Sequence, residues 1–263
     1  MDNVRLSGGA HLLRVRFEGA NVARPVAQPG QFVQMLAAPS QHLLRRPMSI
    51  HDEGDGWRSF LVKPVGPASR ELASRAAGAA IDTSPPLGRG FAPAVALART
   101  PLLLVGGGFG IAPLHFVARR LDALPAGADY RILYGGRSAR DLELESLAGV
   151  RGPVLPATED GSLGFQGTCV DLAARIVGEA GAAASRFVVL TCGPHAMMAA
   201  LHAALYGRVA RVDVSLEEVM ACGVGVCMGC VTSSVRGYVP VCTEGPVFRS
   251  DEVFAPGGEA RHV

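Results

Sequence analysis

Four of the six cysteines in this sequence are grouped near its C-terminal end. Cys222, Cys227, Cys230 and Cys242 follow the spacing C-x4-C-x2-C-x11-C. A tight loop that supplies three thiolates, with a fourth from a later strand, is typical of the plant-type [2Fe–2S] arrangement. The loop also contains glycines, whose freedom to adopt positive φ lets a backbone wrap a cluster and direct N–H groups toward its sulfurs. The spacing therefore predicts that these four cysteines hold a [2Fe–2S] cluster.

Two other uses of the cysteines stay open at this stage. A structural zinc site prefers two C-x2-C pairs, and only Cys227 and Cys230 form such a pair. Disulfides are rare in reducing compartments, and residues 1–17 lack the apolar segment that is typical of a secretory signal. Cys169 and Cys192 stand apart from the group and are not assigned as metal ligands.

A second chemically suggestive set is the turn Gly-Gly-Gly-Phe-Gly at positions 106–110. It follows an apolar, strand-like run at Leu102 to Val105 and precedes an amphipathic helix. A glycine turn in this position lets a dinucleotide pyrophosphate approach the backbone and the helix N-terminus. The turn departs from a strict G-x-G-x-x-G and could also be purely structural. Its candidate NAD contacts are Gly107, Gly108 and Gly110.

A third set, Thr191-Cys192-Gly193-Pro194, closes a strand that we expect at Phe187 to Thr191. Open parallel sheets bind their ligands at the carboxyl ends of the strands, so this turn should face the same crevice as the glycine turn. Cys192, Gly193 and Pro194 are therefore candidate nucleotide contacts. Cys192 could equally be a small buried hydrophobe, which is the commoner fate of a lone cysteine.

A fourth set is the short motif Arg46-Pro47-Met48-Ser49, which follows a β-rich segment directly. The arginine could neutralise a flavin pyrophosphate, and the serine hydroxyl at the start of a strand could hydrogen-bond the isoalloxazine edge. The pattern is only four residues long, and a strand that begins with a surface arginine would explain it as well.

The elements that must position these residues divide the chain into three parts. Residues 1–99 contain many short strands and turns and predict a small antiparallel β-barrel. Residues 100–210 alternate strands and helices and predict a parallel sheet with helices on both faces. Residues 211–263 are rich in Cys and Gly with little periodicity, as we expect of a module held together by a cofactor.

Two short helices are expected within this division. One covers Ser69 to Ala77, with Ser69 as its N-cap, and the other is an acidic helix at Leu142 to Leu147.

Composition narrows the class of protein. An apolar fraction of 49% and a charged fraction of 18% are ordinary for a globular protein with a sizeable core. A formal net charge of +2 gives no reason to expect a nucleic-acid or acidic-membrane partner. The apolar runs have the length of strands, far short of the ~20 residues that a membrane span needs. With the clustered cysteines, this composition predicts a soluble protein of the cytoplasm.

Taken in order, these motifs resemble the ferredoxin–NADP reductase superfamily, in which a flavin barrel precedes a nicotinamide domain. The cysteine segment narrows the resemblance. Residues 217–227 read EEVMACGVGVC and residues 242–248 read CTEGPVF, which is similar to the electron-transfer subunits of NAD-dependent dihydroorotate dehydrogenase. The similarity extends over nearly the whole chain, from about Leu12 to Val253.

The resemblance implies a set of FAD contacts in the barrel. They are Arg46, Pro47, Met48 and Ser49, the strand residues Leu61, Val62 and Lys63, and Ala68 and Ser69 at the pyrophosphate turn. The family usually has Gly-Thr at Ala68-Ser69 and often has an arginine at Val62-Lys63. Here Ser69 keeps a hydroxyl group and Lys63 keeps a positive charge, so the resemblance still implies FAD binding.

The resemblance also implies a mechanism and a partner. In the family, a partner subunit that contains FMN oxidises dihydroorotate, and electrons then pass through the cluster and FAD to NAD, in a heterotetramer of two plus two chains. Such a relay needs no general acid or base in this chain, and none is nominated. A dihydroorotate-oxidising barrel needs about 250 residues of its own, so the substrate site is expected on the partner. A reductase subunit of a cytoplasmic hydrogenase or transhydrogenase and a non-enzymatic metal-binding module remain the alternatives.

Two finer expectations concern the nucleotide and the partner. Thr158-Glu159-Asp160 should lie near the adenosine ribose, where a carboxylate favours NAD over NADP, although Arg137 argues the other way. Val224, Val226 and Met228 are candidate contacts with a partner subunit, or they pack under the cluster.

Overall fold

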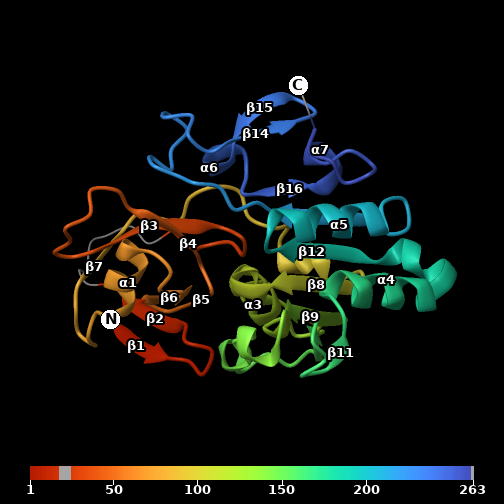
Figure 1. Cartoon of the computed structure of the whole chain (residues 1–263), viewed down its shortest axis with the longest axis horizontal. Helices are drawn as coiled ribbons and strands as arrows, with labels where there is room; N and C mark the ends of the chain where they lie inside the picture. Colours follow the sequence, from red (N-terminus) through yellow and green to blue (C-terminus); the bar gives the residue numbers. More distant parts are fainter. Residues whose placement is uncertain (18–24, 262–263) are drawn as a thin grey trace.

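The N-terminal part of the chain forms two antiparallel sheets that enclose one apolar core (Figure 1). A computed structural model describes residues 1–17 and 25–261. The first sheet has the order β1-β2-β6-β5, with β1 (Asp2–Arg5), β2 (His11–Arg16), β5 (Asp52–Gly54) and β6 (Trp57–Val62). The second has the order β4-β3-β7, with β3 (Phe32–Ala37), β4 (Arg46–Ser49) and β7 (Ile81–Thr83). Alternate side chains such as Leu13, Val15, Val33 and Met35 fill the space between them. The predicted antiparallel barrel is confirmed.

The helix of the barrel begins earlier than predicted. Helix α1 runs from Pro67 to Ala73, and its N-cap is Gly66 instead of Ser69. Proline is favoured in the first turn of a helix because its φ is already helical and its missing N–H would have no intrahelical partner there. Ser69 is therefore the third helical residue, and its hydroxyl oxygen accepts a hydrogen bond from the Gly66 N–H at 2.9 Å.

The middle of the chain builds a seven-stranded sheet with the order β11-β10-β9-β8-β12-β13-β16. Its strands are β8 (Leu102–Gly107), β9 (Tyr130–Gly136), β10 (Val154–Thr158), β11 (Phe165–Gln166), β12 (Val188–Cys192), β13 (Arg211–Ser215) and β16 (Val247–Arg249). All are parallel to their neighbours except β16. The central strand β8 is buried along its whole length, as its unbroken apolar run predicts for a strand covered on both faces.

Helices cover both faces of this sheet, as predicted. Helix α3 (Ile111–Asp122) packs on one face, and α4 (Cys169–Ala180) and α5 (His195–Leu205) pack on the other. The prediction of an acidic helix at Leu142 to Leu147 is wrong. Two 3₁₀ turns, η2 (Ala139–Asp141) and η3 (Leu144–Leu147), take its place, separated by extended backbone at Leu142. The remaining short helices are α2 (Ala94–Leu97), η1 (Gly108–Gly110) and η4 (Gly181–Arg186).

The C-terminal part has more regular structure than its composition predicts. It contains β13 and β16 of the large sheet, the hairpin β14 (Val231–Ser234) and β15 (Gly237–Pro240), and the short helices α6 (Val241–Glu244) and α7 (Ser250–Val253). In Figure 1 this blue segment lies along the top of the molecule, across both the barrel and the seven-stranded sheet. The loop at residues 221–230, between β13 and β14, is called the cysteine loop below. It belongs to this segment.

Polar groups join the barrel to the sheet domain, and several of them are buried. The carboxylate of Glu143 accepts hydrogen bonds from the N–H groups of Gly8 at 3.1 Å and Ala10 at 2.9 Å. The rings of His51 and His115 stack with their centroids 3.9 Å apart, and His51 Nε2 lies 2.8 Å from the Ser146 carbonyl oxygen. Burial, followed by the neighbouring His115, lowers the pKa of His51 to about 3, so the pair is neutral at physiological pH.

Candidate functional site

A cavity of about 410 Å³ lies between the barrel and the sheet domain. The barrel contributes Pro47, Met48 and Ser49 of β4 and Leu61 of β6 to its wall. Across from them are residues of the glycine turn, of α3 and of the segment between β13 and the cysteine loop, namely Phe109, Ala112, Ser215, Leu216, Glu217, Glu218, Val219 and Met220, and Phe32 and Pro246 complete the lining. A largely apolar cavity with a few polar groups at a domain junction suits a flat aromatic ring system.

The remaining barrel residues of the predicted FAD set lie outside this cavity. Val62 points into the barrel core, while Lys63 places its ammonium group 5.1 Å from the centroid of the Phe109 ring. Ala68 and Ser69 are buried at the N-terminal end of α1. Arg46 Nη1 donates to the carbonyl oxygens of its two preceding residues, at 3.3 and 3.4 Å. The structure thus gathers one part of the set around a cavity and spreads the other part along the barrel.

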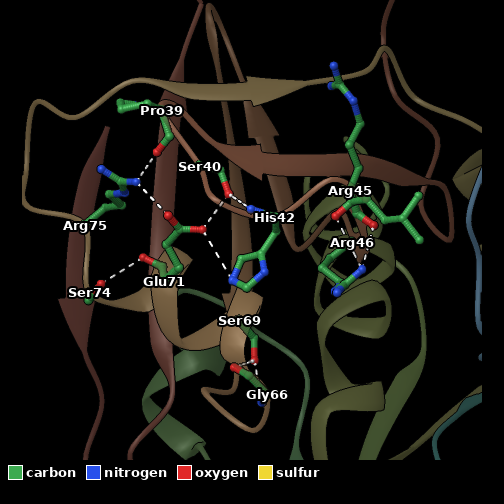
Figure 2. A network of polar contacts seen from close by, with 11 residues as sticks. Pro39, Ser40, His42, Arg45, Arg46, Gly66, Ser69, Glu71, Ser74 and Arg75 are labelled. Carbon is green, nitrogen blue, oxygen red and sulfur yellow. Dashed lines mark hydrogen bonds and ion pairs between the residues drawn. The ribbon is translucent and has the colours of Figure 1, made fainter.

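A polar network fixes the loop before β4 to α1, as Figure 2 shows. Glu71 lies at its centre, where its carboxylate accepts a hydrogen bond from Ser40 Oγ at 2.6 Å and pairs with Arg75 at 2.9 Å. The hydroxyl of Ser40 and the guanidinium of Arg75 lower the pKa of Glu71. His42 lies 3.7 Å from the same carboxylate. The network therefore joins residues 39–42, in the loop that leads to Arg46, to helix α1.

The two predicted nucleotide turns pack against each other at the carboxyl edge of the sheet. A Cβ on Gly110 would lie 2.1 Å from the carbonyl oxygen of Cys192, and one on Gly107 would lie 2.5 Å from Met197 Sδ. Gly193 has φ +154°, and a Cβ there would approach the backbone of Gly107 to 3.1 Å. The backbone atom facing Gly110 and the positive φ of Gly193 require glycine at these two positions, whereas the contact of Gly107 is with the flexible side chain of Met197.

Gly108 differs from its neighbours in the same turn. It has φ +54°, and a Cβ on it would meet no atom within 4 Å. The left-handed conformation explains the glycine, and the open space beside it is where a nucleotide could approach the backbone.

Cys192 and Glu217 meet at the wall of the cavity. Cys192 Sγ lies 3.7 Å from Glu217 Oε1. Cys192 is buried, whereas Glu217 is partly open to solvent and lines the cavity. Loss of water around each group raises the pKa of the Cys192 thiol and of the Glu217 carboxyl group.

The four cysteines predicted to bind metal are drawn together in two pairs. The Cys227 N–H points at Cys222 Sγ at 3.4 Å, and the Cys242 N–H points at Cys230 Sγ at 3.4 Å. Each iron of a [2Fe–2S] cluster takes two cysteine sulfurs. This pairing is compatible with the two-iron cluster that the spacing predicts. Among residues 1–17 and 25–261, no group of three or more His, Cys, Asp or Glu side chains is arranged to hold a single metal ion.

Backbone N–H groups surround these sulfurs. Gly225 donates to Cys242 Sγ at 3.1 Å, and Val224 donates to Cys222 Sγ at 3.5 Å. The N–H groups of Cys227 and Val224 lower the pKa of the Cys222 thiol to about 6, whereas burial raises the pKa of Cys242 to about 11. Left-handed backbone at Gly223, Gly225 and Met228, with φ of 72°, 79° and 55°, makes this wrapping possible.

Several cavity residues were not among the predicted sites. Phe109 lies inside the glycine turn and Glu217 lies just before the cysteine loop, so both belonged to motifs that the sequence had already marked. Met220 also belongs to the segment 217–227, whereas Phe32 carried no such signal, because an apolar residue on a strand gives no sign of which cavity it will face.

Comparison with known proteins places these features in a family. Residues 217–254 match the family described as the iron–sulfur cluster binding domain of dihydroorotate dehydrogenase B. A relative from Listeria monocytogenes serotype 4b (strain F2365), named dihydroorotate dehydrogenase B (NAD(+)), electron transfer subunit, is 35% identical over 230 residues, covering 86% of this chain and 87% of its own. A relative of the same name from Shouchella clausii is 36% identical and covers 88% of each chain. The chain belongs to this family.

Membership of this family confirms the main prediction made from the sequence. The chain is an electron-transfer subunit of the dihydroorotate dehydrogenase B type, an oxidoreductase component, and the resemblance drawn from the cysteine segment is confirmed. The names of these relatives favour this function over the hydrogenase or transhydrogenase alternative.

Solved structures agree with the fold of this family. The structure of an NADH-dependent reduced ferredoxin–NADP oxidoreductase, described in work on flavin-based electron bifurcation, matches with a TM-score of 0.76 at 25% identity, covering 95% of this chain and 87% of that one. Phthalate dioxygenase reductase shares the fold with a TM-score of 0.64 at 16% identity and 92% coverage of each chain. Within the described residues of this subunit, no helix has both the length and the hydropathy of a membrane span.

Proposed function

We propose that this subunit takes electrons from an FMN-containing dihydroorotate dehydrogenase partner and passes them, through a [2Fe–2S] cluster and FAD, to NAD. The two cysteine pairs, Cys222 with Cys227 and Cys230 with Cys242, are the observation that carries the proposal. A cluster of this kind exchanges single electrons, whereas FAD when bound stores two and delivers them to NAD as a hydride. The cofactors expected from the sequence are those that membership of this family supports.

The proposed sites divide the chain by cofactor. Residues 1–99 would hold FAD, residues 100–210 would hold NAD, and residues 211–263 would hold the cluster. The flavin ring would occupy the cavity of about 410 Å³, against Pro47, Met48 and Ser49. Ser49 would offer a hydroxyl to the ring edge, and Glu217 would offer a carboxyl group from another part of the cavity wall. Val62 would contribute only backbone groups, because its side chain points into the barrel core.

The FAD pyrophosphate would lie along the barrel between Arg46 and the N-terminal end of α1. Arg46 supplies a guanidinium group, and the anchored loop before it keeps that group in place. Lys63 would sit where flavin and nucleotide sites meet, because its ammonium group already contacts Phe109 of the glycine turn. Gly108 would let the NAD pyrophosphate approach the backbone, while Gly107, Gly110, Cys192, Gly193 and Pro194 shape the turns around it.

NAD is the preferred nucleotide in this proposal. The loop after β10 is bonded to the loop after β9, because the Asp160 N–H donates to the Arg137 carbonyl oxygen at 3.1 Å. The Asp160 carboxylate accepts hydrogen bonds from the N–H and the hydroxyl group of Ser162. The exposed carboxylate of Glu159 would therefore be the one that accepts bonds from ribose hydroxyls. We expect steady-state rates with NADH to exceed those with NADPH. Glu159→Gln should narrow the gap and Arg137→Gln should widen it, and a clear preference of the wild type for NADPH would refute the proposal.

The partner would dock where apolar side chains surround the cluster loop. Val224, Val226 and Met228 are 55%, 79% and 50% exposed, which is unusual for residues of this type. We propose that they face the catalytic subunit in a heterotetramer of two plus two chains in the cytoplasm. A short distance between the loop surface and the partner would favour electron transfer between them.

Activity of the separate and combined chains tests the function. The purified subunit should pass electrons from NADH to artificial acceptors, because FAD and nucleotide sites both belong to this chain. It should reduce NAD with dihydroorotate only after the FMN-containing partner is added. Oxidation of dihydroorotate at a useful rate by this chain alone would show that the relay is wrong.

A further inference from the structure

A buried amide on strand β3 has no hydrogen-bond partner in the described residues. Gln34 is only 2% exposed, and neither its Nε2 nor its Oε1 has a partner. Nearly all buried polar side chains are hydrogen-bonded, because a donor or acceptor that has lost water and gained nothing destabilises the fold. Both backbone polar groups of Gln34, in contrast, are hydrogen-bonded. Its N–H donates to Ser84 Oγ at 2.9 Å, and its carbonyl oxygen accepts from the Ser84 N–H.

The direction of the side chain follows from the alternation of strand β3. Val33 and Met35 point into the barrel core, so Phe32 and Gln34 share the opposite face. Phe32 lines the flavin cavity, and Gln34 lies two residues further along the same face. Gln34 also pairs in register with Pro47, another cavity residue. The amide therefore lies on the cluster side of the flavin-binding strands.

The cysteine loop packs directly on this amide. A Cβ on Gly223 would lie 2.9 Å from both Cγ and Nε2 of Gln34. Gly223 follows Cys222, the ligand whose sulfur already accepts two backbone N–H bonds. Figure 1 shows the same arrangement at the level of the chain, with the loop between β13 and β14 above β3 and β4.

We propose that Gln34 Nε2 is a hydrogen-bond donor to the [2Fe–2S] cluster, on the side held by Cys222, and that it sets the cluster's reduction potential. This inference rests on the proposed function, since it requires the cluster. Thiolates and sulfides offer only acceptors, so the amide nitrogen is the end of Gln34 that must face them. A donor stabilises the reduced cluster, which carries one more negative charge than the oxidised cluster, and thus raises its potential.

Replacement of Gln34 by methionine tests the inference, because methionine has a similar length and no donor. The potential of the cluster in the full-length holoprotein is measured by redox titration followed by electron paramagnetic resonance. We expect Gln34→Met to favour the oxidised cluster by about tenfold, which is a fall of about 59 mV for a one-electron couple. An unchanged potential would overturn the inference.

Leu87 provides a matched control. Its Cδ1 would lie 3.1 Å from the same Cβ on Gly223, but it has no polar group. Leu87→Ala disturbs the packing under the loop without removing a donor, so it should leave the potential nearly unchanged. An equal fall in Leu87→Ala would mean that packing alone sets the potential, and the role of Gln34 as a donor would be rejected.

A measurement on the wild type does not depend on how a variant folds. Protein labelled with ¹⁵N at glutamine side chains should show a ¹⁵N hyperfine coupling to the reduced cluster, and Gln34→Met should lack it. Absence of the coupling in the wild type would refute the inference. Absence of any iron–sulfur signal in the wild type would refute the proposed function itself, so the two failures are distinguishable.

Discussion

The nucleotide turns and the cysteine loop are both rich in glycine, but their glycines serve different neighbours. In the nucleotide turns, a Cβ on Gly110 would overlap the backbone of Cys192, so space excludes a side chain there. In the cysteine loop, Gly223 and Gly225 adopt positive φ so that N–H groups point at sulfur, and a Cβ on Gly223 would also crowd Gln34. The nucleotide turns therefore depend on close packing at Gly110, and the cysteine loop depends on its left-handed backbone.

This difference shows which region can hold its form alone. The turns lie at the end of buried strands and are supported on both sides by helices. The loop is largely exposed, and its internal bonds run mainly to the sulfurs of Cys222, Cys227 and Cys242. We therefore expect the nucleotide site to survive loss of the cluster, and the loop to depend on it.

The largest effect should follow from removal of one cluster ligand. Cys227→Ser should lose essentially all iron and acid-labile sulfide, because a two-iron cluster cannot be held by three thiolates at this exposed site. Much of the FAD should remain, since Pro47, Met48 and Ser49 line the proposed flavin cavity from the barrel and Cys227 is not part of its wall. Iron, sulfide and flavin analysis of the purified protein measures this. Cys169→Ala, at a buried thiol outside the group, should keep its iron, and unchanged iron in Cys227→Ser would sink the assignment.

The next effect should come from crowding the packed turn. Gly110→Ala places a methyl group 2.1 Å from the Cys192 carbonyl oxygen, a backbone atom that cannot move aside easily. We expect a loss of about 3 kcal/mol in the free energy of unfolding, at the upper end for overpacked sites. Denaturant titration followed by far-ultraviolet circular dichroism measures it. A loss below about 1 kcal/mol would show that the two turns separate readily.

Acid should weaken the junction between barrel and sheet domain by a smaller amount. The pKa of His51 is about 3 in the folded chain against an ordinary value of 6.5, so the unfolded chain binds more protons between these values. The free energy of unfolding should therefore fall as the pH drops below 6.5, by at most about 1.4 kcal/mol per pH unit from this residue.

The variant His51→Gln isolates this contribution. Denaturant titrations from pH 7 to pH 5 should show a shallower fall in the variant than in the wild type, because glutamine does not titrate. Parallel curves for the two proteins would mean that His51 is not the group responsible.

The smallest change in stability should come from the open glycine. Gly108→Ala forces a left-handed alanine, which costs about 1 kcal/mol, but meets no atom of the protein. Its methyl group would stand where the nucleotide pyrophosphate approaches, so we expect the Kd for NADH to rise by about tenfold, a loss of roughly 1.4 kcal/mol. Fluorescence titration with NADH measures the affinity. An unchanged Kd would place the nucleotide elsewhere.

The periodicity of apolar residues and the spacing of the cysteines predicted most of the fold and part of the candidate site. The apolar run at Leu102 to Val105 predicted the central strand β8, and the four-cysteine spacing predicted the sulfurs that the structure pairs. The prediction of an acidic helix was wrong because the Glu143 carboxylate accepts a hydrogen bond from the Ala10 N–H of the barrel. A local sequence pattern does not contain such a long-range interaction. Strand β13 was missed, although Arg-Val-Asp-Val-Ser alternates, because an acidic residue, Asp213, is buried at its centre.

The sequence by itself determined the chemistry that this chain can perform, because the identity of a ligand and its distance along the chain are covalent properties. Four cysteines at this spacing predict a metal site before any fold is known. Only the tertiary structure decided which residues share a site. Glu217 meets Cys192, and Gln34 meets Gly223, because strands and loops distant in the sequence pack side by side. Such contacts arise from the burial of apolar faces by the whole chain, and no local pattern encodes them.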